Sequence, residues 1–147
     1  VIRCYRMLID LYINNKTVSE EEYEWLEKEI GKAENRLTSS GFYKGDVTIN
    51  EQLYDTRTES PTKEYVACVL DYNEETSVAL IEQRNYFETG DLLEAFGPKL
   101  ENKTFIAPIL KDVTTLDEFR VARHPLQQFY IKMPFPVSKF DMIRKVQ

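Results

Sequence analysis

Histidine and cysteine are scarce in this chain of 147 residues, which contains one histidine, His124, and two cysteines, Cys4 and Cys68. These residues fall short of the four ligands of a structural zinc site, so we expect no structural metal. The cysteines lie far apart, one in a helical pattern and one in a strand pattern. We interpret both as buried thiols, which fits a reducing cytoplasm. No apolar run approaches the roughly 20 residues that span a bilayer, so we expect no membrane segment.

Catalytic signatures are also missing. The sequence contains no Gly-rich phosphate loop, no HExxH motif and no nucleophile elbow. A histidine-based acid–base site would need His124. Because Pro125 comes directly after it, His124 is held in an extended or turn conformation, which favours local hydrogen bonding over catalysis. We therefore expect no catalytic residue within this chain.

The net charge of −6 is unevenly distributed. Residues 1–118 carry 13 basic against 24 acidic side chains, whereas residues 119–147 carry six basic and one acidic. The basic tail is consistent with an anion-binding patch. It is equally consistent with a tail that packs near the acidic segments and offsets their charge.

The central stretch 64–98 predicts three β-strands joined by short turns. Residues 64–72 alternate with apolar side chains on both faces, a pattern typical of a strand that is covered on both sides. Asn73 to Glu75 separate this run from a second strand over 76–84. Gly90-Asp91 opens a third strand over 92–96, and Gly97-Pro98 ends it.

Two helices are expected before this stretch. Residues 1–13 are apolar nearly all round, which predicts a helix covered from several directions, and we interpret it as the end of a truncated upstream domain. Ser19 to Glu22 form a capping box that begins a second helix, with its apolar stripe reaching Leu37. We expect a helical hairpin at 1–37, a connecting loop at 38–62 and a β-barrel domain at 63–147.

The remaining strands are expected over 103–111, 119–122 and 126–133, with a bend or an edge at Pro108. The sequence from Ser138 predicts a last short helical turn through Arg144. The fold class predicted is mainly β with an N-terminal helical hairpin, in which six strands form a small closed or nearly closed barrel.

Seven residues are candidates for RNA or anion binding. Arg84-Asn85 and Arg123-His124 both lie where strands turn, and a barrel that joins those ends would form a cationic patch able to hold phosphate. The basic tail adds Lys139, Arg144 and Lys145. Tyr86 and Phe87 could stack on bases if they are exposed. Alternatively, the turn residues only form ordinary turns, and the two aromatic residues only pack in the core.

Five segments occur together in a characteristic order. They are Ser40-Gly41-Phe42-Tyr43, Glu82 to Asn85 with Phe87 and Gly90-Asp91, Phe96-Gly97-Pro98, Ala122 to Gln127, and Phe140 to Lys145. In this ordered set the chain resembles the C-terminal domain of the collagenase-like peptidase family called U-thirty-two. That family includes prephenate-dependent tRNA uridine hydroxylation proteins, and its barrel is similar to domain two of translation elongation factors.

The resemblance implies a fold, a partner and a cofactor for the parent protein. Family members carry an N-terminal catalytic domain with a cysteine cluster that holds an iron–sulfur cluster, and the barrel comes after it. Neither Cys4 nor Cys68 matches that cysteine motif, so the resemblance implies no cofactor within this chain. The implied partners are the N-terminal catalytic domain and tRNA or rRNA, with no membrane.

Three functions are alternatives. The first is a non-catalytic accessory domain of a cytoplasmic RNA hydroxylase that helps position RNA. The second is a structural module that packs on the catalytic domain through the apolar first helix and stabilises it. The third is the substrate-binding domain of a true protease, as the family label suggests.

Overall fold

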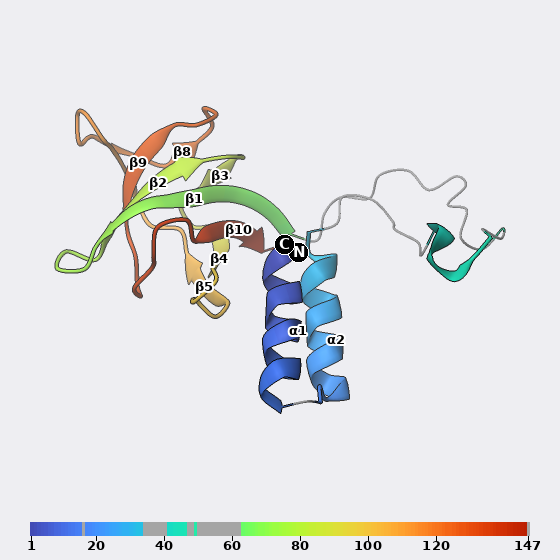
Figure 1. Ribbon diagram of the computed structural model, residues 1–147. Helices are drawn as coiled ribbons and strands as arrows, with labels where there is room; N and C mark the ends of the chain where they lie inside the picture. The colour runs from blue at the N-terminus through green and yellow to red at the C-terminus, as the bar shows by residue number, and fades with distance from the viewer. Residues whose placement is uncertain (16, 34–40, 47–48, 50–62, 147) are drawn as a thin grey trace. The chain divides into compact units, whose positions relative to one another are not determined.

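The computed structural model describes residues 1–15, 17–33, 41–46, 49 and 63–146 (Figure 1). The chain divides into two compact units, Val1–Thr62 and Lys63–Gln147. The first contains two helices and a short 3₁₀ helix, η1 (Gly41–Lys44), and the second contains all the described strands. The prediction of a mainly β chain with two N-terminal helices is confirmed. Most of the predicted loop 38–62 lies outside the described residues.

The helices α1 (Ile2–Asn15) and α2 (Glu20–Gly31) form an antiparallel pair. The predicted capping box is confirmed: the Ser19 side chain accepts from the Glu22 backbone N–H, and the Glu22 carboxylate accepts from that of Ser19. The α2 helix ends at Gly31 and does not run to Leu37 as predicted, because Lys32 and Ala33 already form a turn. Leu37 itself lies outside the described residues. Neither of the two helices is long and apolar enough to cross a membrane.

The sheet unit is built from two antiparallel sheets. The larger has eight strands in the order β5-β4-β10-β1-β2-β9-β6-β7, and the smaller pairs β3 with β8. Their bounds are β1 Lys63–Asn73, β2 Val78–Gln83, β3 Phe87–Glu88, β4 Leu92–Phe96, β5 Lys103–Ile106, β6 Leu110–Asp112, β7 Glu118–Phe119, β8 Val121–Ala122, β9 Gln128–Lys132 and β10 Met142–Val146. The predicted six-stranded barrel is not confirmed.

The eight-stranded sheet is strongly curled. Strands β5 and β6 are six strand spacings apart in the sheet order, which would be about 29 Å in a flat sheet. Only residues 107–109 connect them in the sequence, and such a link spans at most about 14 Å. The sheet must therefore bend until these two strands approach each other. The predicted interruption at Pro108 is the point where the chain crosses from β5 to β6.

One face of the curled sheet encloses the core. Alternate residues of β2 and β9 are buried on this face, as in the pairs Ala79–Ile131 and Ile81–Phe129. The ring of Phe129 contacts the rings of Phe87 and Phe119, at centroid distances of 5.9 and 5.7 Å. Two irregularities in the pairing of β1, one with β10 and one with β2, mark bulges. Bulges bend a strand and increase its twist, which is what this curl requires.

The predicted helical turn at 138–144 is wrong. Ser138 and Asp141 do form a local cap, in which the Asp141 carboxylate accepts from the Ser138 backbone N–H at 2.8 Å. Phe140 has a φ of 73°, which turns the chain away from a helix. Residues from Met142 on then form β10, which pairs with β1 on one side and β4 on the other. Local capping chemistry predicted the turn, but pairing with two strands makes the next residues a strand and not a helix.

Gly97 provides a test of how tightly this end of the sheet is packed. Its position faces buried Asp141, and a methyl group there would overlap the Asp141 carboxylate. We expect Gly97→Ala to lower the free energy of unfolding by about 1–3 kcal/mol, the usual cost of overpacking. Urea denaturation of the chain measures it.

Gly31→Ala is the matched control, because nothing lies within 4 Å of a Cβ at that position. We expect it to be neutral or to stabilise by up to about 1 kcal/mol, since alanine favours helix. Equal stability of the two variants would show that Asp141 moves aside without cost.

Candidate nucleic-acid interface

The structure brings together the two turns that carry the candidate residues. Gln83, the last residue of β2, donates its backbone N–H to the Gln127 carbonyl at 2.9 Å, and its own carbonyl accepts from the Leu126 N–H at 3.1 Å. Its side-chain amide donates to the Ala122 carbonyl at 3.3 Å. Phe87 pairs with Ala122 just beyond the first turn. Residues 84–86 and 123–127 therefore lie side by side, and we call them the paired turns.

The first turn is held by β1. The backbone N–H groups of Arg84 and Asn85 both donate to the Val66 carbonyl, at 2.7 and 3.2 Å, and the Asn85 side-chain amide donates to the Tyr65 carbonyl at 2.8 Å. One donor of the Asn85 amide is thus committed to holding the turn. The Arg84 side chain is exposed and ion-pairs with Glu82 at 2.6 Å.

The second turn presents an exposed cation, Arg123. Within the described ranges no acidic side chain forms an ion pair with it. His124 is exposed beside it, and its carbonyl accepts from the Gln127 N–H at 3.0 Å, which closes the turn. Leu126 has a φ of 62° and an exposed side chain. The paired turns thus offer Arg84, Arg123 and the His124 imidazole to solvent.

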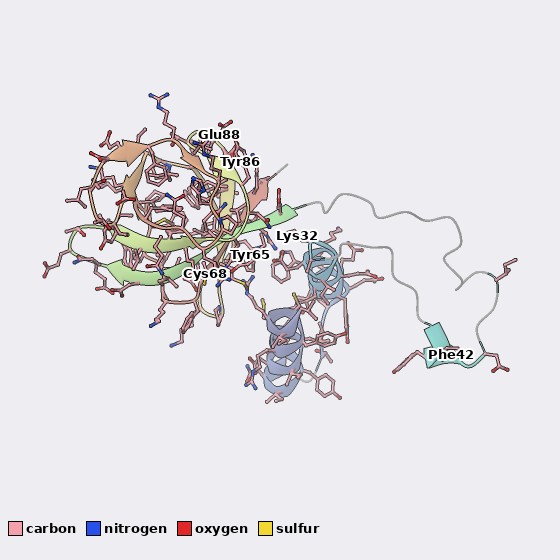
Figure 2. The ribbon with its side chains drawn as sticks, turned by 90° about the horizontal axis from the view of Figure 1, so that it is seen from above. Lys32, Phe42, Tyr65, Cys68, Tyr86 and Glu88 are labelled. Atoms are coloured by element: carbon pink, nitrogen blue, oxygen red, sulfur yellow. The ribbon has the colours of Figure 1, made fainter. Side chains whose placement is uncertain are left out.

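Lys145 joins this surface through Tyr86. Its ammonium lies 5.8 Å from the Tyr86 ring centroid and 2.7 Å from the Asp91 carboxylate. The Tyr86 hydroxyl donates to Glu88 at 3.1 Å, and this hydrogen bond raises the pKa of Tyr86. Figure 2 shows Tyr86 and Glu88 next to each other on the sheet unit. Tyr86 is 49% exposed, so its ring is available for stacking. The predicted partner Phe87 is not, because it is buried in the core.

Arg144 is buried and does not lie on the surface with the other candidate residues. Its Nε donates to the Glu94 carboxylate at 2.7 Å, and its guanidinium stacks 4.3 Å from the Phe96 ring centroid. A charge count along the tail could not reveal this, because the burial results from the β10–β4 register that places Arg144 opposite Glu94.

Lys139 is exposed but does not join the paired turns. It precedes β10, where the neighbouring Phe140 N–H bonds to Val69, and its ammonium lies 5.2 Å from the Phe140 ring centroid. Strands β10 and β2 flank β1 on opposite sides, so Lys139 and the turn after β2 are held on different sides of that strand.

Tyr65 is a residue that the sequence analysis missed. It is partly exposed on β1, and its hydroxyl interacts with the Cys68 thiol and the Arg84 guanidinium. Partial burial and the Cys68 thiol raise the pKa of Tyr65, although Arg84 opposes the rise. Figure 2 labels both Tyr65 and Cys68 on this unit. Nothing in the alternation of 64–72 distinguishes Tyr65 from a core residue, because only the pairing shows what lies beside it.

The two cysteines alone do not supply the four ligands of a common iron–sulfur cluster. Both thiols are buried as predicted, Cys4 in α1 and Cys68 in β1, so they belong to different compact units. A cluster takes four cysteine ligands in its common forms, and the chain has two. Among the described residues no group of three or more histidine, cysteine or acidic side chains could hold a metal ion.

The Lys145–Asp91 pair makes stability depend on pH. Burial alone would raise the pKa of Asp91, but hydrogen bonds from Lys145 and from the Glu88 N–H outweigh it and lower that pKa. A lowered carboxyl pKa stabilises the fold at neutral pH, and this contribution is lost as the pH falls through the folded-state value. We expect Lys145→Met to cost about 1 kcal/mol at pH 7 and progressively less below pH 4, as measured by urea denaturation across pH.

Lys111→Met is the control for this measurement. Lys111 pairs with Glu118 at 3.2 Å, but both side chains are more than half exposed, so we expect a change below about 0.5 kcal/mol. A cost of Lys145→Met that stayed constant from pH 7 to pH 2 would contradict the role given to Asp91.

Comparison with known proteins agrees with the resemblance found in the sequence. Residues 61–144 match the model of the Peptidase family U32 C-terminal domain. Over 145 residues the chain is 35% identical to tRNA hydroxylation protein P1 of Bacillus subtilis (strain 168), and the match covers 99% of this chain and 34% of that protein. The chain thus spans about a third of the length of this curated relative.

Two solved structures show the same similarity. Both are crystal structures of the C-terminal domain of a Geobacillus thermoleovorans protein named as a U32 peptidase, one of them a selenomethionine variant. The first is 39% identical with a TM-score of 0.55, and covers 57% of this chain and 93% of its own. The second is 40% identical with a TM-score of 0.53, and covers 56% and 99%. The predicted resemblance is confirmed, and the chain belongs to the family of peptidase family U32 C-terminal domains.

Proposed function

We propose that this chain is a non-catalytic accessory domain that helps position an RNA substrate for a cytoplasmic enzyme that hydroxylates RNA. The observation that carries the proposal is the juxtaposition of Arg84 and Arg123 on the paired turns, beside exposed Tyr86. Exposed cations contact phosphates, and an adjacent ring can stack on an unpaired base. The name of the Bacillus subtilis relative supports tRNA as the RNA.

The role is positioning and not catalysis. His124 is the one histidine of the chain and lies on an exposed turn, whereas the two thiols are buried elsewhere, so the described residues offer no cysteine nucleophile beside a histidine base. In this proposal the reaction and any iron–sulfur cluster belong to another part of the full-length protein. For the same reason, a peptidase activity of this chain is the least favoured of the three alternative functions.

A likeness to domain two of translation elongation factors is part of the proposal. The curl of the eight-stranded sheet, with β5 and β6 joined by three residues, supports a small barrel-like body. The hydrogen bonds between Gln83 and the second turn hold the backbones of Arg84 and Arg123 at a defined spacing. A fixed spacing is what recognition of a phosphate backbone by shape requires.

Binding of tRNA at several salt concentrations tests the proposal. Each phosphate contact lowers the affinity as salt rises, with a slope of about 0.7–0.9 per contact in a plot of log K against log salt. We expect Arg84→Gln/Arg123→Gln to weaken binding at low salt by about tenfold or more, and to reduce the slope by about 2.

The matched control is Lys99→Gln/Lys132→Gln, which removes the same charge from exposed positions away from the paired turns. We expect its affinity to stay within about twofold of the parent chain. If the two double variants lose affinity equally, binding reflects overall charge and the proposed site is wrong. The absence of tRNA binding at low salt would reject the function itself.

A further inference from the structure

The α1 helix exposes a continuous apolar stripe. Each member lies three or four residues from another member, so all of them lie on one side of the helix. They are Ile2, Tyr5, Ile9, Tyr12 and Ile13, with exposed fractions of 86, 58, 49, 63 and 66%. Single exposed apolar residues are ordinary, but a contiguous apolar patch on a surface marks an interaction site. We call these five residues the α1 stripe.

Most of the α1 stripe lies outside the contact between the helices. Leu8 lines a groove together with Leu26 and Ile30 of α2, and Leu11 lines another with Trp25. Of the stripe, Tyr5 also borders the first groove, with 58% of its surface still exposed. Leu26 is 4% exposed, so the α2-facing side of the pair is already packed. Figure 1 shows the two helices side by side along their length.

The rest of α1 is polar in the usual way. Arg6 and Asp10 form an exposed ion pair at 2.8 Å, and Asn14 and Asn15 are exposed at the end of the helix. The helix thus has one side packed on α2, one polar side and one apolar side in contact with water. Only the third is unusual for a water-facing helix.

The comparisons show that the chain is part of a longer protein in its Bacillus subtilis relative. The crystallised C-terminal domains match 57 and 56% of this chain, close to the share of the sheet unit, which is 85 of 147 residues. The Bacillus subtilis relative aligns with 99% of the chain, helices included, and is about three times as long. The family match at residues 61–144 and the size of the crystallised domains both correspond to the sheet unit, whereas the Bacillus subtilis relative also aligns with the helices.

We propose that the α1 stripe is the docking surface for the upstream catalytic part of the full-length polypeptide. The occupant is an apolar face of that part, and its contact with the stripe orders α1. The α1 stripe and the paired turns share no residue, so failure of the docking would leave the observations behind the proposed RNA site unchanged.

Hydrogen exchange of the α1 amides tests the docking. We expect α1 to exchange at least tenfold more slowly in the full-length polypeptide than in the chain of 147 residues alone. Ile9→Glu/Tyr12→Glu should remove this difference, because it places two charges in the stripe. Asn14→Glu/Asn15→Glu adds the same charge to the same helix outside the stripe and should preserve it. Exchange of the β1 amides, unchanged in both variants, verifies that the sheet unit is intact.

Three outcomes would overturn the proposal. The first is equal α1 exchange in the full-length polypeptide and the chain alone, or equal loss of protection in the two variants. The second is a dimer of the chain alone in sedimentation that Ile9→Glu/Tyr12→Glu abolishes, since the stripe would then bind a second copy. The third is co-sedimentation of the chain with anionic phospholipid vesicles that the same variant abolishes, since the stripe would then bind a membrane.

Discussion

The curl of the eight-stranded sheet is the constraint on which the sheet unit depends. A link of three residues joins β5 to β6 across a sheet order that would hold them about 29 Å apart if it were flat. Without the curl, the inner face of β2 and β9 would have no opposing surface. With it, Phe129 meets Phe87 and Phe119, and the core closes around aromatic contacts. The bulges of β1 allow this central strand to bend with the sheet.

Strand pairing assembles the candidate site. Gln83 exchanges backbone hydrogen bonds with Leu126 and Gln127 at the end of the β2–β9 pairing, and Phe87 pairs with Ala122. This pairing sets the two turns side by side, although some 40 residues separate Arg84 from Arg123 in the sequence. Two arginines this far apart in the sequence are brought together by strand pairing, which no short sequence pattern reveals. The candidate interface is therefore a consequence of strand pairing.

Sequence reasoning succeeded where the signal was local. The capping box at Ser19 and the alternation in 64–72 predicted α2 and β1, because capping and burial act within a few residues. It failed where pairing decided the outcome. From the sequence, Arg144 was predicted to be one of the exposed cations of the basic tail. The register of β10 instead buries it against Glu94. β3, with two residues, carries no periodic pattern that could have been recognised.

Binding at the two proposed surfaces is driven by different interactions, so a rise in salt concentration affects the two differently. Phosphate contacts by Arg84 and Arg123 weaken as salt rises, because the release of counterions from the RNA then gains less free energy. Apolar burial of the α1 stripe is insensitive to moderate salt and is strengthened by sulfate or phosphate. A protein in which both surfaces act would thus release RNA at high salt while α1 stays protected from exchange. Loss of both together would instead indicate that ordering of α1 and RNA binding are coupled.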